Sequence, residues 1–320
     1  MTPQTLVSVV LCTYNGESHL RPQLDSILQQ THPHWELIVQ DDGSTDRTLE
    51  ILEAYRENHP DRAIRLYRNK PRLGYNRNFF SAVQHARGEL IACCDQDDVW
   101  EAEKLAVLVS EMQDEMLIFH NSVLFNDRYP DLGLLHRKPW PRHPHPFGVL
   151  INPKAYGHQI LFRREALPHI AAFADRNVSY DSLIYTLCAQ LGPVRYVDRV
   201  LVHWRRHAEA TTFTGRKVNR NRLYGYYTAL RALPKKQNRR IVRRYFALCE
   251  SLPLALPDAR RMARLMASGS LYNLFRTSLL CMRHRRELLP DETSPAMSRL
   301  KAFFLPLFFL RDYGLGIVRD

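Results

Sequence analysis

The chain has 320 residues, enough for one large domain or two modest ones with a substantial core. Hydrophobic residues make up 45% and charged residues 24%, and the mean hydropathy is −0.36, which argues against disordered, collagen-like and membrane-embedded classes. The net charge of +12 is unevenly spread, because residues 201–320 hold 24 Lys and Arg against 8 Asp and Glu, whereas residues 1–200 hold 21 against 25. The basic character belongs to the last third.

The cysteines and the apolar runs predict the cellular compartment of the protein. Six cysteines are scattered without a C-x-x-C pair, which favours reduced thiols and a cytosolic compartment. Residues 1–16 show neither a basic lead nor a small-residue cleavage site, so we expect no signal peptide. The longest apolar block, 302–310, contains a proline and is far shorter than the roughly 20 residues of a membrane span. We expect it to lie on a membrane rather than to cross one.

The first hundred residues alternate β-branched apolar runs with amphipathic stretches, which predicts a parallel sheet covered by helices. Strands are predicted at 6–12, 36–40, 64–67 and 89–94, and helices from Ser18, as a cap, to 28, at 48–57, at 76–86 and near 101–115. The proline- and histidine-rich stretch 136–147 is predicted to be a mobile loop. Residues 148–207 return to α/β structure, and helices are expected beyond about 218.

Polar clusters follow three of the predicted strands, at 13–15, 41–42 and 95–98. In open α/β sheets ligands bind at the carboxyl ends of the strands, so we expect these clusters to converge on one crevice. The acidic groups would repel one another without a cation between them, and oxygen ligands favour Mg²⁺ or Mn²⁺, completed by phosphate oxygens. The first strand is not followed by a glycine-rich phosphate loop, which argues against ordinary kinases and dehydrogenases.

Three motifs, at 7–16 (VSVVLCTYNG), 41–46 (DDGSTD) and 94–100 (CDQDDVW), closely resemble those of the family 2 glycosyltransferases of GT-A fold. The D-Q-D-D-[VI]-W variant is similar to the rhamnosyltransferase-like branch. The resemblance covers about residues 6–210. It implies an α/β fold with a GT-A type, Rossmann-like mixed sheet flanked by helices in residues 1–217. The composition of the remaining chain predicts a helical, basic C-terminal extension in residues 218–320.

The resemblance also implies roles for individual residues. Thr13, Tyr14 and Asp41 are expected to contact the nucleotide base, and Asp95 the ribose region. Asp97 is expected to hold the metal that bridges the diphosphate, with support from Asp98. The remaining implied donor-site residues are Asn15, Asp42, Gly74, Tyr75, Asn78 and Gln96, with Arg205 or Arg206 neutralising the diphosphate. His207 is the implied second metal ligand, and His203 is its alternative.

Glycosyl transfer with inversion needs a carboxylate near the acceptor hydroxyl to take its proton. By the resemblance, Asp181 is the candidate base, although Tyr180 stands where family members usually have Glu or His. Asp175 is the competing candidate. The segment 157–159 (GHQ) falls where the family has a small-residue turn beside the acceptor.

The resemblance implies transfer of a sugar from a nucleotide-diphosphate donor, dTDP-rhamnose or a UDP- or GDP-hexose, to a hydroxyl of a cell-surface polysaccharide or lipid-linked acceptor. In residues 235–246, basic and apolar side chains alternate at helical spacing, as on a helix that lies on an anionic surface. We therefore expect the chain to lie on the cytoplasmic face of the membrane. A solvated helix face is the simpler alternative for that run.

Two other functions stay open from the sequence. A sugar-nucleotide nucleotidyltransferase also uses paired acids on an α/β sheet, but it usually begins with a glycine-rich basic loop, which residues 11–16 lack. A nucleic-acid-binding protein would use the basic last third and would leave the acidic clusters without a role. We expect no nucleic acid among the partners.

Overall fold

The structure is a computed structural model, and it describes residues 4–138, 140–153, 155–172, 179–206, 222–254, 256–290 and 292–313. The chain forms two compact units. The α/β unit comprises Met1–His143, Ala155–Asp175 and Tyr180–Ala210, and the helical unit comprises Pro144–Lys154, Arg176–Ser179 and Thr211–Asp320. The domain boundary predicted at residue 217 lies outside the described residues and stays a prediction.

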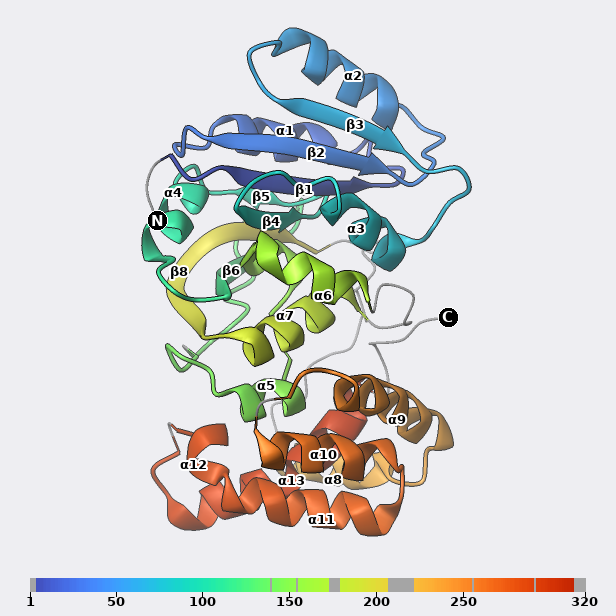
Figure 1. Cartoon of the computed structure of the whole chain (residues 1–320), viewed down its shortest axis with the longest axis vertical. Coiled ribbons are helices and arrows are strands. Elements are labelled where there is room, and N and C mark those ends of the chain that lie inside the picture. Colours follow the sequence, from blue (N-terminus) through green and yellow to red (C-terminus); the bar gives the residue numbers. More distant parts are fainter. Residues whose placement is uncertain are drawn as a thin grey trace. The chain divides into compact units, whose positions relative to one another are not determined.

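In the described part of the α/β unit, eight strands form a mixed sheet (Figure 1). Their order is β3 (Ile64–Arg68), β2 (Trp35–Asp41), β1 (Val7–Thr13), β4 (Leu90–Cys94), β7 (Ile160–Arg163), β6 (Leu117–Phe125), β8 (Val194–Arg205) and β5 (Val99–Trp100). The first four are parallel, whereas β7 is antiparallel to β4 and to β6. Because β1, β2 and β4 are parallel, their carboxyl ends lie at the same edge of the sheet.

The parallel strands are buried as their sequences predict. Every residue of β1, β2 and β4 is buried, which fits strands covered on both faces. The helices of this unit are α1 (Leu20–Leu28), α2 (Thr48–Asn58), α3 (Tyr75–Val83), α4 (Lys104–Glu111), α6 (Leu167–Ala171) and α7 (Tyr180–Leu191), with short 3-10 turns at Gly157–Gln159 and Arg164–Ala166. The predicted alternation of strands and helices over the first hundred residues is confirmed.

The start of the first helix differs from the prediction. Helix α1 begins at Leu20, so His19 and not Ser18 occupies the N-cap position. No side chain caps this end. The main-chain N–H groups of His19 and Leu20 instead both donate to the carbonyl oxygen of Gly16, at 3.0 Å each, so the turn after β1 takes the place of the cap.

The stretch 136–147, predicted as a mobile loop, contains the start of a helix and aromatic contacts of Trp140. Helix α5 (Pro146–Ile151), which belongs to the helical unit, begins within it. In the α/β unit, Trp140 Nε1 donates to His136 Nδ1 at 3.2 Å, and the Trp140 ring lies 5.7 Å from that of Phe119. The prolines and histidines of this segment do not predict these contacts, which an aromatic side chain makes.

The described part of the helical unit adds six helices beyond residue 218, as predicted: α8 (Arg222–Ala232), α9 (Lys236–Glu250), α10 (Pro257–Ala267), α11 (Leu271–Arg283), α12 (Arg285–Leu288) and α13 (Pro295–Tyr313). Helix α9 carries the basic run. It buries an apolar face that includes Val242, Tyr245 and Phe246 and exposes Arg240 and Arg243. Amphipathic spacing thus serves packing within the unit.

The apolar block 302–310 lies in α13 and contributes to the core of the helical unit. The ring of Phe309 lies 5.3 Å from that of Tyr245 and 5.1 Å from that of Phe246. The ring of Phe304 lies 4.8 Å from that of Tyr226. None of the helices that the structure describes has the length and apolarity needed to span a bilayer.

Candidate active site

The carboxyl ends of β1 and β2 are joined through Thr13 and Asp41. These residues are paired in the parallel register, and Thr13 Oγ1 donates to Asp41 Oδ1 at 3.1 Å. Asp41 Oδ2 accepts from the main-chain N–H groups of Gly43 at 3.0 Å and Ser44 at 2.9 Å. Asp41 is 1% exposed. Hydrogen bonds therefore fix the carboxylate that the sequence assigns to base recognition.

Asn15 ties the loop after β1 to the loop after β2. Its φ of 49° lies in the left-handed region, which Asn tolerates better than most residues. Its N–H donates to Ser44 Oγ at 2.9 Å, and its Oδ1 accepts from the N–H of Thr45 at 2.9 Å. The two loops therefore hold one another in place.

Gln96 ties the loop after β4 to the loop after β1. Its Oε1 accepts from the N–H of Tyr14 at 2.9 Å, and its Nε2 donates to the carbonyl oxygen of Tyr14 at 3.1 Å. A Cβ atom on Gly16 would lie 2.4 Å from Gln96 Oε1, so this contact needs glycine at position 16. The three polar clusters that the sequence places at strand ends are thus brought together.

Asp42 organises the segment that leads into α3. Its carboxylate accepts from Asn69 Nδ2 at 2.8 Å and from the N–H groups of Leu73 at 2.7 Å and Gly74 at 2.8 Å. Gly74 has a φ of 81° and occupies the N-cap position of α3. The implied donor residues Asp42 and Gly74 therefore belong to one hydrogen-bonded turn.

The same segment places Arg72 against the loop after β1. The Arg72 guanidinium lies 3.5 Å from the centre of the Tyr14 ring, a cation–π contact. Tyr75 is exposed, whereas Asn78 is buried and donates from Nδ2 to the carbonyl oxygen of Gln40 at 2.9 Å. Arg72 was not among the predicted site residues, although its position two residues before Gly74 was an available signal.

Asp95, Asp98 and His158 form a cluster of potential metal ligands in the part of the chain that the structure describes. One ligand atom from each lies within 4.8 Å of the others. His158 Nδ1 lies 3.9 Å from Asp95 Oδ2 and 4.0 Å from Asp98 Oδ2. His158 Nε2 lies 3.1 Å from Ser122 Oγ, so the ring presents Nδ1 to the carboxylates.

The chemistry of this cluster fits a divalent cation. Asp98 is fully buried, and its Oδ1 accepts from the N–H of Arg205 at 3.0 Å. Its Oδ2 has no hydrogen-bond partner among the described residues, and an unpartnered buried carboxylate oxygen is costly. Carboxylate oxygens suit Mg²⁺ and Mn²⁺, and a bound cation would satisfy this atom.

The pKa values of the cluster reflect the close approach of several carboxylates in a buried place. Burial and the neighbouring carboxylate of Asp97 raise the pKa of both Asp95 and Asp98. Asp181 adds to the rise in the pKa of Asp95. Burial and nearby cationic groups lower the pKa of His158 well below its usual range, so its imidazole is neutral at pH 7. A cation would relieve the repulsion between the carboxylates.

Lys104, which the sequence analysis did not single out, lies fully buried beside the cluster. Its Nζ donates to the carbonyl oxygen of His158 at 2.8 Å and lies 3.3 Å from the centre of the Trp100 ring. Burial lowers the pKa of Lys104 to about 7. The available signal was a lysine at the start of the helix directly after the acidic run.

Arg205 fastens the acidic run to β8. Its Nε donates to the carbonyl oxygen of Asp97 at 2.9 Å, and its guanidinium pairs with Asp127. Arg206, its alternative for the diphosphate, lies with its guanidinium 4.4 Å from the Trp204 ring. That either arginine binds a diphosphate stays a prediction, and so does the binding of a metal by Asp97.

The structure describes one of the two candidates for the second metal ligand and one of the two candidates for the base. His207 and Asp175 lie outside the described residues. His203 Nε2 lies 2.7 Å from Glu101 Oε1. Asp181 lies in the first turn of α7, where its Oδ1 accepts from the N–H of Ser182 at 2.6 Å. Its effect on the pKa of Asp95 puts it within electrostatic reach of the acidic cluster.

Tight packing fixes the start of α7 and therefore Asp181. The ring of the preceding residue, Tyr180, stacks on that of Phe79 with 3.9 Å between centroids. A Cβ atom on Gly157 would lie 1.7 Å from the Tyr180 hydroxyl oxygen, so only glycine fits there. The small-residue turn predicted at 157–159 thus contains His158 of the acidic cluster and contacts Tyr180.

The sheet is mixed, and the acidic loops converge at the carboxyl ends of its parallel strands β1, β2 and β4. This fold is of the GT-A type. The crystal structure of S. aureus TarS 1-349 in complex with UDP matches with a TM-score of 0.55 and 15% identity, covering 95% of this chain and 89% of that one. The mannosyltransferase PcManGT from Pyrobaculum calidifontis, in complex with GDP-Man and Mn²⁺, matches with a TM-score of 0.54 and 20% identity, covering 95% and 85%.

The family model of glycosyl transferase family 2 matches residues 8–170, so the chain belongs to this family. A relative in Escherichia coli, the UDP-Glc:alpha-D-GlcNAc-diphosphoundecaprenol beta-1,3-glucosyltransferase WfgD, is 37% identical over 108 residues, which cover 33% of this chain and 41% of that protein. The aligned segments span 33–44% of the length of the first three curated relatives.

Proposed function

We propose that this protein is a glycosyltransferase that moves a sugar from a nucleotide-diphosphate donor to a hydroxyl of a polysaccharide or lipid-linked acceptor. The convergence of Asp95, Asp98 and His158 beside the loops after β1 and β2, in a chain of glycosyl transferase family 2, carries the proposal. The E. coli relative supports a lipid-linked acceptor, because its name specifies a diphosphoundecaprenol-linked one.

The proposed cofactor is Mg²⁺ or Mn²⁺. Asp95, Asp98 and His158 would hold it, and the sequence adds Asp97 and His207 as ligands. When bound, the cation neutralises the negative charge of the departing diphosphate. The Mn²⁺ complex of the Pyrobaculum structure supports this choice.

The chain's own residues would orient and deprotonate the reactants. Thr13, Tyr14 and Asp41 hold the nucleoside, and Asp181 takes the proton of the acceptor hydroxyl. The acceptor oxygen then forms a bond to the anomeric carbon as the bond from that carbon to the diphosphate breaks. This single displacement inverts the anomeric centre and releases a nucleoside diphosphate.

The donor is proposed to be dTDP-rhamnose or a UDP- or GDP-hexose. A panel of these donors, assayed by release of the nucleoside diphosphate with water and simple sugars as acceptors, tests the proposal. We expect one donor to be consumed with Mn²⁺ or Mg²⁺ and to be spared in EDTA. Release of pyrophosphate would indicate a nucleotidyltransferase, and full activity in EDTA with an intact fold would remove the metal from the mechanism.

We further propose a peripheral position on the inner face of the cytoplasmic membrane, with anionic lipid as a partner. The strongly basic residues 201–320 and the membrane-linked acceptor named for the E. coli relative support this location.

A further inference from the structure

The helical unit exposes an unusual amount of apolar surface on three of its helices. Nine large hydrophobic side chains of α8, α11 and α13 are exposed: Tyr224, Tyr227, Leu230, Leu271, Tyr272, Phe275, Leu279, Met297 and Leu300. Tyr272 is the most exposed of them, at 70%. Surface groups of this extent mark interaction sites in soluble proteins.

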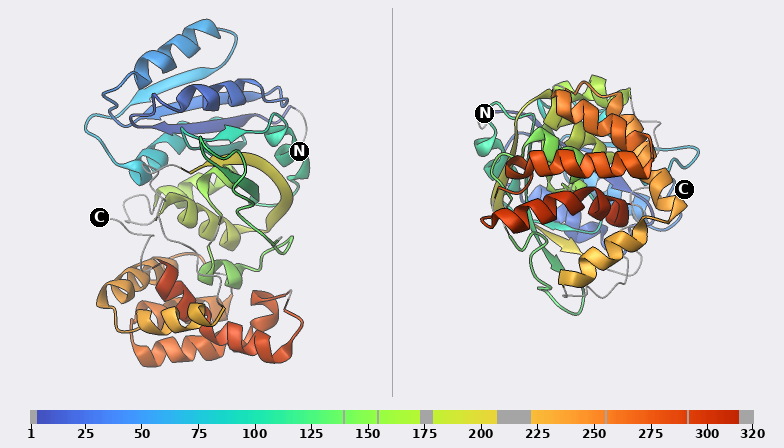
Figure 2. Two further views of the ribbon diagram at one scale, coloured as in Figure 1. Left: turned by 180° about the vertical axis from the view of Figure 1, so that it is seen from behind. Right: turned by 90° about the horizontal axis from the view of Figure 1, so that it is seen from below.

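These three helices form a layer. Helix α13 packs against α11 on one side and α8 on the other, and the right-hand view of Figure 2 shows the three side by side. The ring of Phe275 in α11 lies 6.0 Å from that of Phe303 in α13, and Tyr226 in α8 packs on Phe304. We call the outward side of this layer the α11–α13 face.

Helix α11 shows the orientation of this face most clearly. Tyr272, Phe275 and Leu279 recur at the spacing of one helix side and are exposed, whereas Leu280 and Cys281 point to the opposite side and are buried. The outward side is therefore the apolar one, the reverse of a solvated helix.

The charge of these three helices indicates which class of partner the face binds. Helices α8, α11 and α13 contain seven Arg and Lys residues and a single acidic residue, Asp312. Asp312 is paired with Arg311, with 2.6 Å between Nε and Oδ1. An exposed apolar and aromatic face with almost purely positive charge complements an anionic lipid surface, in which tyrosines occupy the headgroup level.

A basic hollow adjoins the apolar side chains. It has a volume of about 220 Å³ and is lined by Arg261, Arg276, Leu279, Leu280 and Arg283. One of its arginines also faces an acid: Asp258 Oδ2 lies 3.9 Å from Arg283 Nη1 and 2.7 Å from His284 Nε2. Three arginines and two leucines suit a phosphate headgroup with the start of its acyl chain.

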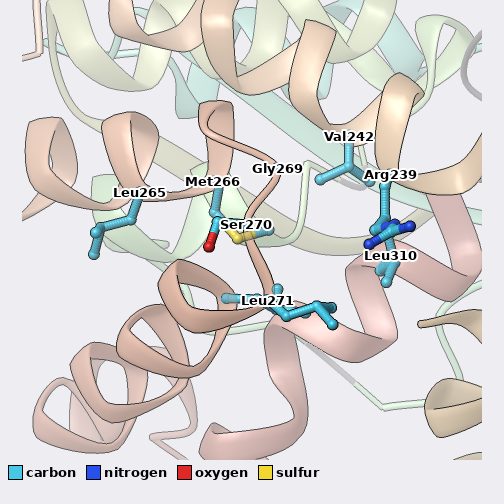
Figure 3. Close-up of a pocket in the computed structure, with 9 residues that line it drawn as sticks. Arg239, Val242, Leu265, Met266, Gly269, Ser270, Leu271 and Leu310 are labelled. Carbon is cyan, nitrogen blue, oxygen red and sulfur yellow. The ribbon is translucent and has the colours of Figure 1, made fainter. Parts of the chain in front are cut away.

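A small apolar cavity that Leu271 lines does not offer an alternative ligand site. It lies between α9, the α10–α11 turn and α13, with Leu265, Met266 and Val242 among its walls (Figure 3). Its volume of about 20 Å³ has room for little more than one water molecule. This cavity therefore has no part in the binding surface.

We propose that the α11–α13 face docks on a bilayer that contains anionic lipid, with Arg276 and Arg283 at phosphate groups and Tyr272 and Leu279 in the headgroup region. This inference rests on the proposed membrane-linked acceptor. It moves the contact from α9, whose run at 235–246 the sequence favoured, to a different set of helices.

Flotation of the full chain with phosphatidylcholine vesicles, with and without phosphatidylglycerol, tests this face. The wild-type protein should float only with phosphatidylglycerol. Tyr272→Ser/Leu279→Ser should lower the bound fraction about tenfold or more, and Arg276→Gln/Arg283→Gln about fivefold for each arginine removed. All four side chains lie at the surface of the unit, so a thermal melt should remain unchanged.

Two matched controls distinguish the α11–α13 face from a general effect of exposed apolar side chains or of net positive charge. Leu132→Ser/Leu134→Ser removes two exposed apolar side chains from the α/β unit, and Arg240→Gln/Arg243→Gln removes the same charge from α9. Both should float within twofold of wild type, because neither pair lies on α8, α11 or α13.

Three results would overturn the inference. Undiminished flotation of the Tyr272→Ser/Leu279→Ser protein would show that the α11–α13 face does not bind the bilayer. A loss of flotation only in the Arg240→Gln/Arg243→Gln protein would show that α9 makes the contact. A dimer in light scattering that this variant dissociates, without flotation of the wild type, would assign the face to a second copy. Flotation needs no donor, so its failure and a failure of glycosyl transfer to simple sugars are distinguishable.

Discussion

The two units of this protein place unusual side chains in opposite ways. The α/β unit buries polar groups, including Asp41, Asp98, Lys104 and His158, each at most 1% exposed. The helical unit instead exposes large apolar ones, such as Tyr272 and Phe275. Buried polar groups require partners, and exposed apolar groups favour contact with another apolar phase. This contrast underlies our two proposals, catalysis in the α/β unit and membrane attachment through the helical unit.

The largest expected effect is the loss of a carboxylate from the acidic cluster. Asp98→Asn should lower transfer about 10³–10⁴-fold, since the cation that neutralises the leaving group loses a ligand. Turnover of the best donor in Mn²⁺ measures this effect. Asp114→Asn, at an exposed position of the same unit, should leave the rate unchanged.

The same variant tests whether the effect is chemical or structural. Without metal, Asp98→Asn should be as stable as wild type or more so, because repulsion from Asp95 and Asp97 falls while an amide oxygen can still accept from the N–H of Arg205. A thermal melt that drops strongly would show that Asp98 supports the fold rather than the reaction.

A smaller effect is expected at the candidate base. Asp181→Asn should slow transfer by about 10²-fold or more while donor affinity stays near that of wild type, because only proton removal from the acceptor is lost. Separate measurement of donor binding and turnover decides this. Loss of donor binding would make Asp181 a ligand, and an unchanged rate would pass the role to another residue.

A substitution that disturbs the packing beside the site should lower the stability of the protein. Gly157→Ala places a Cβ atom 1.7 Å from the Tyr180 hydroxyl oxygen, so we expect the free energy of unfolding to fall by about 1–3 kcal/mol. Urea denaturation measures the change. Gly148→Ala is the control, since the nearest atom to its added Cβ lies at 3.7 Å. Equal stability of both variants would contradict the packing described for α7.

The smallest effect concerns a buried carboxylate remote from the acidic cluster. Burial tends to raise the pKa of Glu36, but hydrogen bonds from Ser8 Oγ, the Arg87 amide and Arg65 outweigh it, so the pKa lies below its usual 4.5. The ionised group therefore stabilises the fold above about pH 4.5, and this contribution is lost as the pH falls through the lowered pKa.

Glu36→Gln should consequently cost about 1 kcal/mol of unfolding free energy at pH 7 and little at about pH 3. Urea denaturation at both pH values checks this, with the exposed Glu50→Gln as the control. An equal loss at both pH values would show that the hydrogen bonds, and not the charge, matter at Glu36.

The sequence predicted the sheet and the loops well, because buried β-branched runs and the polar residues that end them are local patterns. Thr13, Asp41 and Gln96 lie where strand ends meet, as parallel pairing requires. The partners of these groups were not predictable from local patterns. His158 follows Asp95 by 63 positions and reaches it only because β7 pairs with β4, and Lys104 reads as an ordinary helix residue until its burial is known.

The helical unit shows the converse limit. Its helices could be predicted, but a hydrophobic pattern does not say whether an apolar side faces the core or solvent. The basic helix α9 and the aromatic block 302–310 were favoured for membrane contact, yet Val242 and Tyr245 of α9 and Phe309 of the block pack in the core. The exposed side of α11 has no sequence feature that distinguishes it from a buried one.

Binding of Mn²⁺ to the full chain, titrated alone and with UDP, GDP or dTDP, tests most directly whether the acidic loops grip a cation together with the leaving group. We predict that one of these nucleotides tightens Mn²⁺ binding at least about tenfold and that Asp98→Asn abolishes this gain. Mn²⁺ affinity that is unaffected by every nucleotide and by the substitution would contradict the account.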